Sequence, residues 1–221
     1  MTTGAKQEKP PTTRSQSGRR AKRSEETRER IFRAALQLFA ERGFNATTIE
    51  AITAAADVGK GTFFNYFENK ESVLLEYREL QMERVTAFVT ANKESDRPLA
   101  PLLLELALTL TMEQGKNPGL IQSLLTAVFG SETVQKRMAE AIERNVQQLS
   151  GLFARRQQSA EVRDDLGALT IAQAFQRMIF GTMIIWSLAP VDPVEDNLKK
   201  GIEVFVNGVR SKWQPATKDT P

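Results

Sequence analysis

The stretch that decides the fold is TTIEAITAAADVGKGTFFNYFENKESVL, residues 47–74. It opens with Thr47 and Glu50 at the spacing of a capping box, in which the two side chains accept hydrogen bonds from free backbone amides at a helix start. The helix that begins there is short, because residues 56–59 interrupt it with an Ala-Asp-Val-Gly turn. A second short helix is predicted over about 60–67. Two short helices joined by a tight turn predict a helix-turn-helix unit.

Longer helices are predicted on both sides of this unit. The preceding helix runs over about 25–42, with Ser24 as its cap and apolar residues that recur at helical spacing. Gly43 ends it, because glycine readily takes the left-handed conformation that helix ends need. After the unit, Asn69 can cap a helix over about 70–91. The inward-facing residues of the unit are predicted to be Ile49, Ile52, Val58, Phe63 and Phe67. The second short helix then has its opposite face free to enter a DNA major groove.

The charge of the chain is concentrated at its N-terminus. The 221 residues carry 30 Lys and Arg against 27 Asp and Glu, a net charge of +3. Residues 1–23 hold seven basic residues and one acidic residue, whereas residues 24–80 carry a net charge of −3. Because residues 1–23 have almost no large apolar side chains, we expect them to be disordered. A basic arm on a neutral body favours a polyanionic partner, either nucleic acid or an anionic membrane surface. The alternative is a tail that serves only solubility.

The composition argues against an enzyme. The chain has no cysteine and no histidine, which excludes disulfides, thiolate nucleophiles, the usual zinc sites and imidazole-based acid–base chemistry. Glu161, Asp164 and Asp165 form an acidic cluster, but they resemble a polar loop and lack any accompanying nucleophile–base spacing. We therefore predict no catalytic residues, no cofactor and no metal site.

A cytoplasmic protein without a membrane partner is expected. The absence of cysteine and of a signal-peptide pattern in residues 1–20 favours the cytoplasm. The longest uncharged apolar run, residues 178–191, is shorter than the ~18–20 residues that cross a bilayer. We expect it to be a buried helix.

The remaining chain predicts an all-α protein of about nine helices. No stretch alternates with a period of two, and prolines punctuate apolar segments of helical length. The helices expected after residue 95 lie at about 99–113, 119–129, 132–157, 165–188 and 193–213.

Residues 47–74 resemble the helix-turn-helix signature of the TetR family of bacterial transcriptional regulators. The elements that carry the resemblance are Thr47-Thr48, the turn at 56–59, the segment Gly61-Thr62-Phe63-Phe64-Asn65-Tyr66-Phe67, and Lys70. The match covers about residues 28–75, and the rest of the chain resembles the family only in length and helical character. The chain departs from the family at Asp57, where glycine is common, and at Gly59, where serine or threonine is usual. It also has Phe64 where tyrosine is common.

The resemblance implies which residues meet DNA. They are Thr47, Thr48, Lys60, Gly61, Thr62, Phe64, Asn65, Tyr66 and Lys70. Lys60 can reach guanine edges or phosphate, and Phe64, which has no hydroxyl, is suited to a thymine methyl. Lys70 lies beside a helix N-terminus, where free amides favour an anion. The alternatives are a solvated surface position for Lys60, a core position for Tyr66, and helix caps for Thr47 and Thr48.

The resemblance also implies the function and the domains. It predicts a homodimeric repressor that binds a palindromic double-stranded DNA operator and is released by a small hydrophobic effector. The domains are a disordered arm at 1–23, the helix-turn-helix domain at 24–70, and an effector-binding and dimerisation domain at 71–221. The alternative is an architectural DNA-binding protein without effector control.

Two sets of residues in the body bear on this function. An aromatic and Met-rich set predicts either an adaptable effector pocket or ordinary core: Met112, Met138, Met178, Met183, Phe129, Phe153, Phe175, Phe180 and Trp186. Arg177 either faces an acidic effector or lies at an interface or in solvent. The helices at 165–188 and 193–213 predict the dimer interface, through Ala172, Ala174, Gly181, Ile202, Phe205, Val206 and Val209. The alternative is that both stripes are intramolecular core.

Overall fold

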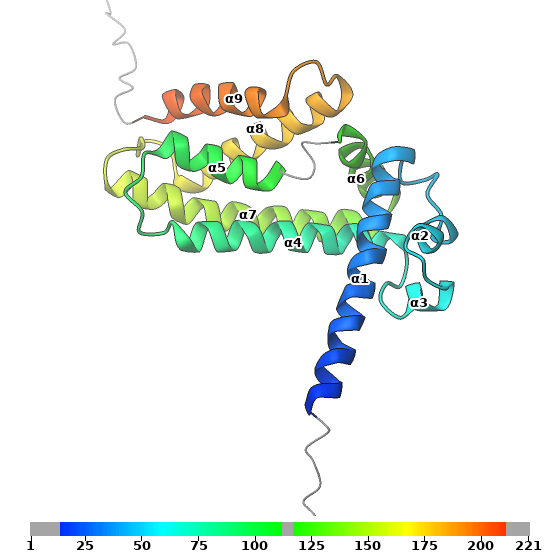
Figure 1. The fold of residues 1–221 in the computed structure, drawn as a ribbon. Helices are drawn as coiled ribbons and strands as arrows, with labels where there is room; N and C mark the ends of the chain where they lie inside the picture. The colour runs from blue at the N-terminus through cyan, green and yellow to red at the C-terminus, as the bar shows by residue number, and fades with distance from the viewer. Residues whose placement is uncertain (1–13, 112–116, 211–221) are drawn as a thin grey trace, which may run out of the picture.

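The computed structural model describes residues 14–111 and 117–210. That part of the chain is all-α, as predicted, with nine helices and a single isolated bridge between Val162 and Arg210. The helices are α1 (Arg14–Arg42), α2 (Ile49–Ala55), α3 (Lys60–Phe64), α4 (Lys70–Ala91), α5 (Leu99–Thr111), α6 (Pro118–Gly130), α7 (Glu132–Gln158), α8 (Ala168–Leu188) and α9 (Val194–Val209). Figure 1 shows α1–α3 at one end of an elongated body in which α4 and α7 lie side by side.

The helix-turn-helix unit has its own apolar core. The predicted core residues Ile52, Phe63 and Phe67 are buried, while Ile49 and Val58 are half-buried against them. The same core includes residues of α4 and α6 as well as α1: Ile31, Phe39, Val73, Tyr77, Leu120 and Ala127. The DNA-binding unit is therefore packed onto the body through α4 and α6.

Several helix ends agree with the expected signals. Gly43 has a φ of +83°, the left-handed conformation predicted at the end of α1. Asn69 caps α4, because its side chain accepts a hydrogen bond from the backbone amide of Ser72, whose hydroxyl in turn accepts from the Asn69 amide.

The start of α1 differs from the prediction. The helix begins at Arg14 rather than near Glu25, so the expectation of disorder is wrong for residues 14–23, and residues 1–13 lie outside the described part. Ser24 consequently lies within the helix and is not its cap. Residues 14–23 contain no proline and are mostly Arg, Lys, Gln, Ala and Ser. Because the packed part of α1 already supplies the helical nucleus, these residues extend it without a new nucleation cost.

The start of α2 and the length of α3 also differ. Thr48, not Thr47, caps α2 by accepting a hydrogen bond from the Ala51 amide at 3.1 Å, so the capping box between Thr47 and Glu50 does not form. The Thr47 hydroxyl instead donates to the carbonyl oxygens of Leu38 and Gly43. The regular α-helix of α3 ends at Phe64, and residues 65–66 form a turn.

The larger core lies between α4, α5, α7, α8 and α9. Ile202, Val206 and Val209 of α9 are buried in it, and Phe205 packs against the rings of Phe153 and Phe175. The predicted dimer stripe on α9 is therefore intramolecular core. The reason is that α9 covers α5 and α8, so its most apolar face is needed within one chain.

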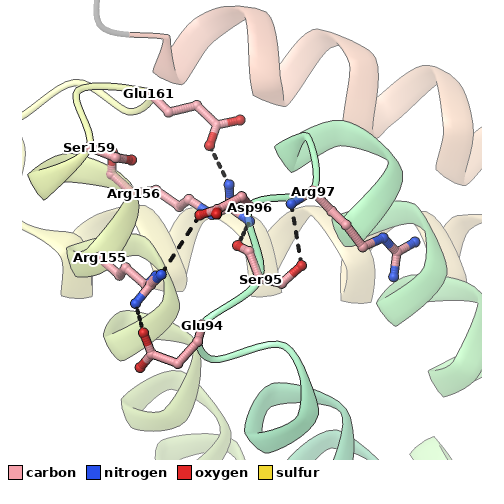
Figure 2. Close-up of polar contacts among 8 residues, drawn as sticks. All are labelled: Glu94, Ser95, Asp96, Arg97, Arg155, Arg156, Ser159 and Glu161. Atoms are coloured by element: carbon pink, nitrogen blue, oxygen red, sulfur yellow. Dashed lines mark hydrogen bonds and ion pairs between the residues drawn. The ribbon is translucent and has the colours of Figure 1, made fainter.

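A polar cluster closes the body at the end distant from α1–α3. Figure 2 shows Arg156 between the α4–α5 loop and Glu161. The buried guanidinium of Arg156 donates to the Glu161 carboxylate at 2.6 Å and to the Ser95 carbonyl at 2.9 Å. The second oxygen of Glu161 accepts from the Leu99 amide at the start of α5. Glu161, a member of the acidic cluster, thus joins α7 to α5.

Helix α8 is long and apolar enough to cross a membrane by length and composition alone. Buried core helices pass the same test, and α8 packs against α6, α7 and α9. Its buried residues include Phe175, Ile179 and Met183. We therefore describe α8 as a core helix of the body.

Candidate nucleic-acid interface and body cavity

The exposed face of α3 is presented by a short, tightly held turn. Asp57 has a φ of +51°, which supplies the left-handed position that glycine would take more easily. Gly59 caps α3 in an extended conformation without a side-chain hydrogen bond. The fully buried ring of Phe63 fixes the inner side of α3. These constraints turn the opposite side of α3 toward solvent.

Five of the predicted DNA-contacting residues lie together on this face. Lys60, Gly61, Phe64 and Asn65 are exposed, and Thr62 is half-buried. The Phe64 side chain is unusual there, because a large aromatic residue is 49% exposed. A carbon atom added at Gly61 would meet nothing within 4 Å, so the backbone at this position is open to close approach. Thr48 is also exposed, at the start of α2.

Lys60 is paired with an acidic residue of the same face. Its Nζ lies 2.5 Å from a carboxylate oxygen of Glu50, and both side chains are largely exposed. The hydrogen bond from Lys60 holds the pKa of Glu50 below its usual value. Because this pair is open to solvent, water screens it and Lys60 can exchange Glu50 for another anion.

Three predicted contact residues are engaged inside the protein. Thr47 is only 1% exposed, so its side chain has no access to DNA. The Nζ of Lys70 donates to the carbonyl oxygens of Phe44 and Thr47, at 2.8 and 3.1 Å, and lies over the Phe44 ring. Lys70 thereby ties the start of α4 to the α1–α2 turn. The half-buried Tyr66 has its hydroxyl 3.0 Å from that of Ser24 on α1.

The start of α1 adds a basic surface that is helical, although its composition predicts a flexible arm. Figure 1 shows this part of α1 projecting away from the other helices. Its exposed basic residues include Arg19, Arg20, Lys22 and Arg23. The signal for one long helix is the continuous run of residues without proline after Pro11, basic at first and then amphipathic.

The body contains a cavity of about 280 Å³ between α4, α5, α6, α7 and α8. Four members of the predicted aromatic and Met-rich set line it: Met138, Phe175, Phe180 and Met183. Phe153 and Trp186 belong to the core instead, Phe129 is 80% exposed, and Met112 lies outside the described residues. The half-buried Met178 lies against Gly201 of α9, and Arg177 is exposed on α8.

The polar side chains of the cavity cannot be identified from the sequence. Arg78, Asn145 and Gln176 line it, and Arg78 is the only charged residue among the described lining residues. The last two residues are 4% and 5% exposed. Periodicity cannot distinguish such residues from ordinary polar residues on the outer face of a helix.

Comparison with known proteins agrees with this architecture. Residues 31–77 match the family model described as bacterial regulatory proteins, tetR family. The uncharacterized HTH-type transcriptional regulator YerO of Bacillus subtilis is 44% identical over 50 residues, which cover 23% of this chain and 17% of that protein. The fatty acid metabolism regulator protein of Bacillus subtilis is 26% identical over 157 residues, 69% of this chain and 77% of that protein.

A solved structure extends the similarity across the body. Thermus thermophilus FadR, a TetR-family transcriptional repressor in complex with lauroyl-CoA, has a TM-score of 0.61 and 26% identity, covering 86% of this chain and 98% of that one. The helix-turn-helix unit, the helical body and these similarities agree. The chain belongs to the TetR family of bacterial regulatory proteins, which are DNA-binding transcriptional regulators and not enzymes.

Proposed function

We propose that this protein is a homodimeric repressor that binds a palindromic operator and releases it when a small, largely apolar molecule occupies the body cavity. The observation that carries the proposal is the position of α6. One face of α6 lines the cavity through Ile121, Leu124, Leu125 and Val128, and other residues of α6 pack against α1. A molecule in the cavity is therefore one helix away from the DNA-binding unit.

The contact between α6 and α1 is close and directional. The buried Ser123 hydroxyl donates to the Phe39 carbonyl oxygen at 2.6 Å. Gly119 lies so near Ala40 that an added carbon atom would come within 2.0 Å of the Ala40 carbonyl oxygen. Because packed helices shift as units, a movement of α6 would displace α1 and with it the unit that holds α3.

Helix α4 makes a second connection. Its first residue, Lys70, binds carbonyl oxygens of the α1–α2 region, and Glu76 accepts a hydrogen bond from Arg28 of α1 at 2.6 Å. Two residues further along α4, Arg78 lines the cavity. The effector must bind the arrangement that does not fit DNA more tightly than the one that does, since equal affinities would shift nothing.

The DNA face in this proposal consists of the exposed residues of α2 and α3. Thr48, Lys60, Gly61, Thr62, Phe64 and Asn65 remain as predicted contacts. Asn65 offers an amide that can read adenine, and Phe64 offers an apolar ring to a thymine methyl. Thr47 is withdrawn because its side chain is buried. Lys70 and Tyr66 act first in positioning α3, and any contact they make with phosphate is additional.

The dimer surface is the outer face of α8 and α9. Ile185 and Leu188 of α8 are 69% and 71% exposed, and Val204 of α9 is 74% exposed. A carbon atom added at Gly181 would meet nothing within 4 Å, so a partner helix can approach closely there. Large exposed apolar side chains on adjacent helices are typical of an interaction surface. A twofold dimer through this face would present two copies of α3 to the two halves of a palindrome.

The effector part of the proposal is supported by the cavity and by one relative. Thermus thermophilus FadR binds lauroyl-CoA, a ligand with a long apolar chain. The cavity here is mostly apolar and about 280 Å³, near the lower end of the range for small-molecule sites. An architectural DNA-binding protein would have no need for such a cavity, so we favour effector control.

Selection of genomic fragments by the full-length protein tests the function. We expect the retained fragments to share an inverted repeat. On the strongest fragment, Phe64→Ala and Asn65→Ala should each cost about 1–3 kcal/mol in fluorescence anisotropy and should affect random DNA much less. The matched control is Gln135→Ala, at an exposed position of α7. Equal losses on operator and random DNA, or retained fragments with no common sequence, would favour the architectural alternative.

A further inference from the structure

We infer that the cavity binds an aliphatic carboxylate, with its ionised head group on Arg78 and its chain along the apolar wall. This inference rests on the proposed effector role of the cavity and specifies the ligand class. The chain would lie among Leu110, Ile121, Leu125, Val128, Ile179 and Met183.

The first observation is the state of Arg78. Its Nε and Nη2 atoms are buried and have no hydrogen-bond partner among the described residues. The guanidinium carbon lies 5.8 Å from the centre of the Phe180 ring, a contact that attracts the cation but satisfies none of its N–H groups. Burial lowers the pKa of Arg78 from its usual value, yet an arginine side chain stays protonated in proteins. A buried cation without an anion is costly, and a ligand anion would remove that cost.

The second observation comes from two other helices. The side chains of Asn145 on α7 and Gln176 on α8 line the same cavity and are more than nine-tenths buried. The Oδ1 of Asn145 and both polar atoms of the Gln176 amide have no hydrogen-bond partner in the described part of the chain. Since buried polar groups in native proteins are nearly always hydrogen-bonded, three such residues in one cavity indicate a polar ligand group between them.

The chemistry of these groups selects the ligand head. A carboxylate accepts two parallel hydrogen bonds from one guanidinium, and its remaining lone pairs can accept from the Gln176 amide. An amine would add a second positive charge beside Arg78. An alcohol or a thioester carbonyl would accept a hydrogen bond but would leave the charge of Arg78 unbalanced. The cavity of about 280 Å³ has room for a chain of modest length and not for a nucleotide.

Calorimetry with matched probes tests this assignment without DNA. The probes are hexanoate, decanoate and tetradecanoate, each with its corresponding alcohol and coenzyme A thioester. We expect at least one acid to bind about 10- to 100-fold more tightly than its alcohol, because hydrogen bonds to charged groups contribute most of the difference. Arg78→Met should lose this preference while Arg78→Lys keeps part of it. The control Arg144→Met, at an exposed arginine of α7, should bind as the natural protein does.

A second measurement guards against misfolding of the variant. Arg78→Met removes a buried, unbalanced charge, so the ligand-free variant should melt at the same or a higher temperature than the natural protein. The acid that binds best should raise the melting temperature of the natural protein but not that of Arg78→Met.

The outcomes separate this inference from the proposed function. Alcohols that bind as tightly as acids, or an Arg78→Met variant that binds acids normally, would overturn the carboxylate site. Binding of thioesters alone would also overturn it, while leaving a small-molecule-controlled repressor in place. If no acid binds, the aliphatic carboxylate is the wrong ligand class, and operator binding still tests the repressor separately.

Discussion

Replacement of Gly119 by alanine should break the contact through which α6 meets the DNA-binding unit. The added carbon atom would lie 2.0 Å from the carbonyl oxygen of Ala40, and ordinary contacts begin near 3.4 Å. The two backbones would therefore have to separate by about 1.4 Å, since neither is the end of a flexible side chain. Overpacking of this kind costs about 1–3 kcal/mol of folding free energy.

The same change should alter DNA binding. Separation at Gly119 would lengthen or break the hydrogen bond from Ser123 to the Phe39 carbonyl, which lies one turn further along α6. We expect Gly119→Ala to lower the free energy of unfolding in urea and to weaken operator binding in fluorescence anisotropy.

The matched control lies on the same helix. Gly130 ends α6, and a carbon atom added there meets nothing within 4 Å. Gly130→Ala should therefore leave stability unchanged or raise it by up to about 1 kcal/mol, the usual difference between glycine and alanine in a helix. If Gly119→Ala were as stable as Gly130→Ala and bound the operator normally, the α6–α1 contact would not couple the two parts of the protein.

The dimer surface, one buried carboxylate and the basic start of α1 can each be tested by substitution. Ile185→Glu should give folded monomers in size-exclusion chromatography with light scattering, whereas Val206→Glu, at a position 4% exposed, should unfold the body; a dimeric Ile185→Glu would place the interface elsewhere. Burial raises the pKa of Glu76 above 4.5 despite Arg28, so folded protein binds this proton more tightly and loses stability as pH rises from 4.5 through the folded pKa. Urea melts of Glu76→Gln should lack that part of the pH dependence, and an unchanged profile would contradict the assignment. Replacing four basic residues with glutamine should flatten the salt dependence of binding by about 0.9 per lost phosphate contact, and an identical slope would remove this surface from the DNA interface: Arg19, Arg20, Lys22 and Arg23.

Local patterns in the sequence are sufficient to predict the helix-turn-helix unit. The turn, the cap at Asn69 and the end of α1 at Gly43 depend on neighbouring residues, and the buried Phe63 and Phe67 follow from helical spacing. The absence of cysteine and histidine likewise limits the possible chemistry through composition alone. The local features are predictable because their physical causes lie within a few residues of each other along the chain.

Other features depend on which surfaces meet in three dimensions. Thr47 and Thr48 are equally good caps by residue type, and only the packing of Thr47 against α1 assigns the cap to Thr48. The apolar stripe of α9 suits a dimer or a core equally well, and its burial by α5 and α8 decides between them. In each case, two interpretations of one local pattern have similar local energies, and contacts between distant segments separate them.

The cavity shows this dependence most clearly. Arg78, Asn145 and Gln176 lie on three helices, far apart in the sequence, and each is an ordinary polar residue in its own helix. Their importance arises because the fold buries their polar atoms together in an apolar space, where the cost of leaving them unpaired is high. The helices and the DNA-binding unit could be predicted from the sequence, whereas the ligand site is a property of tertiary packing, because burial of a polar group is decided by its neighbours in space.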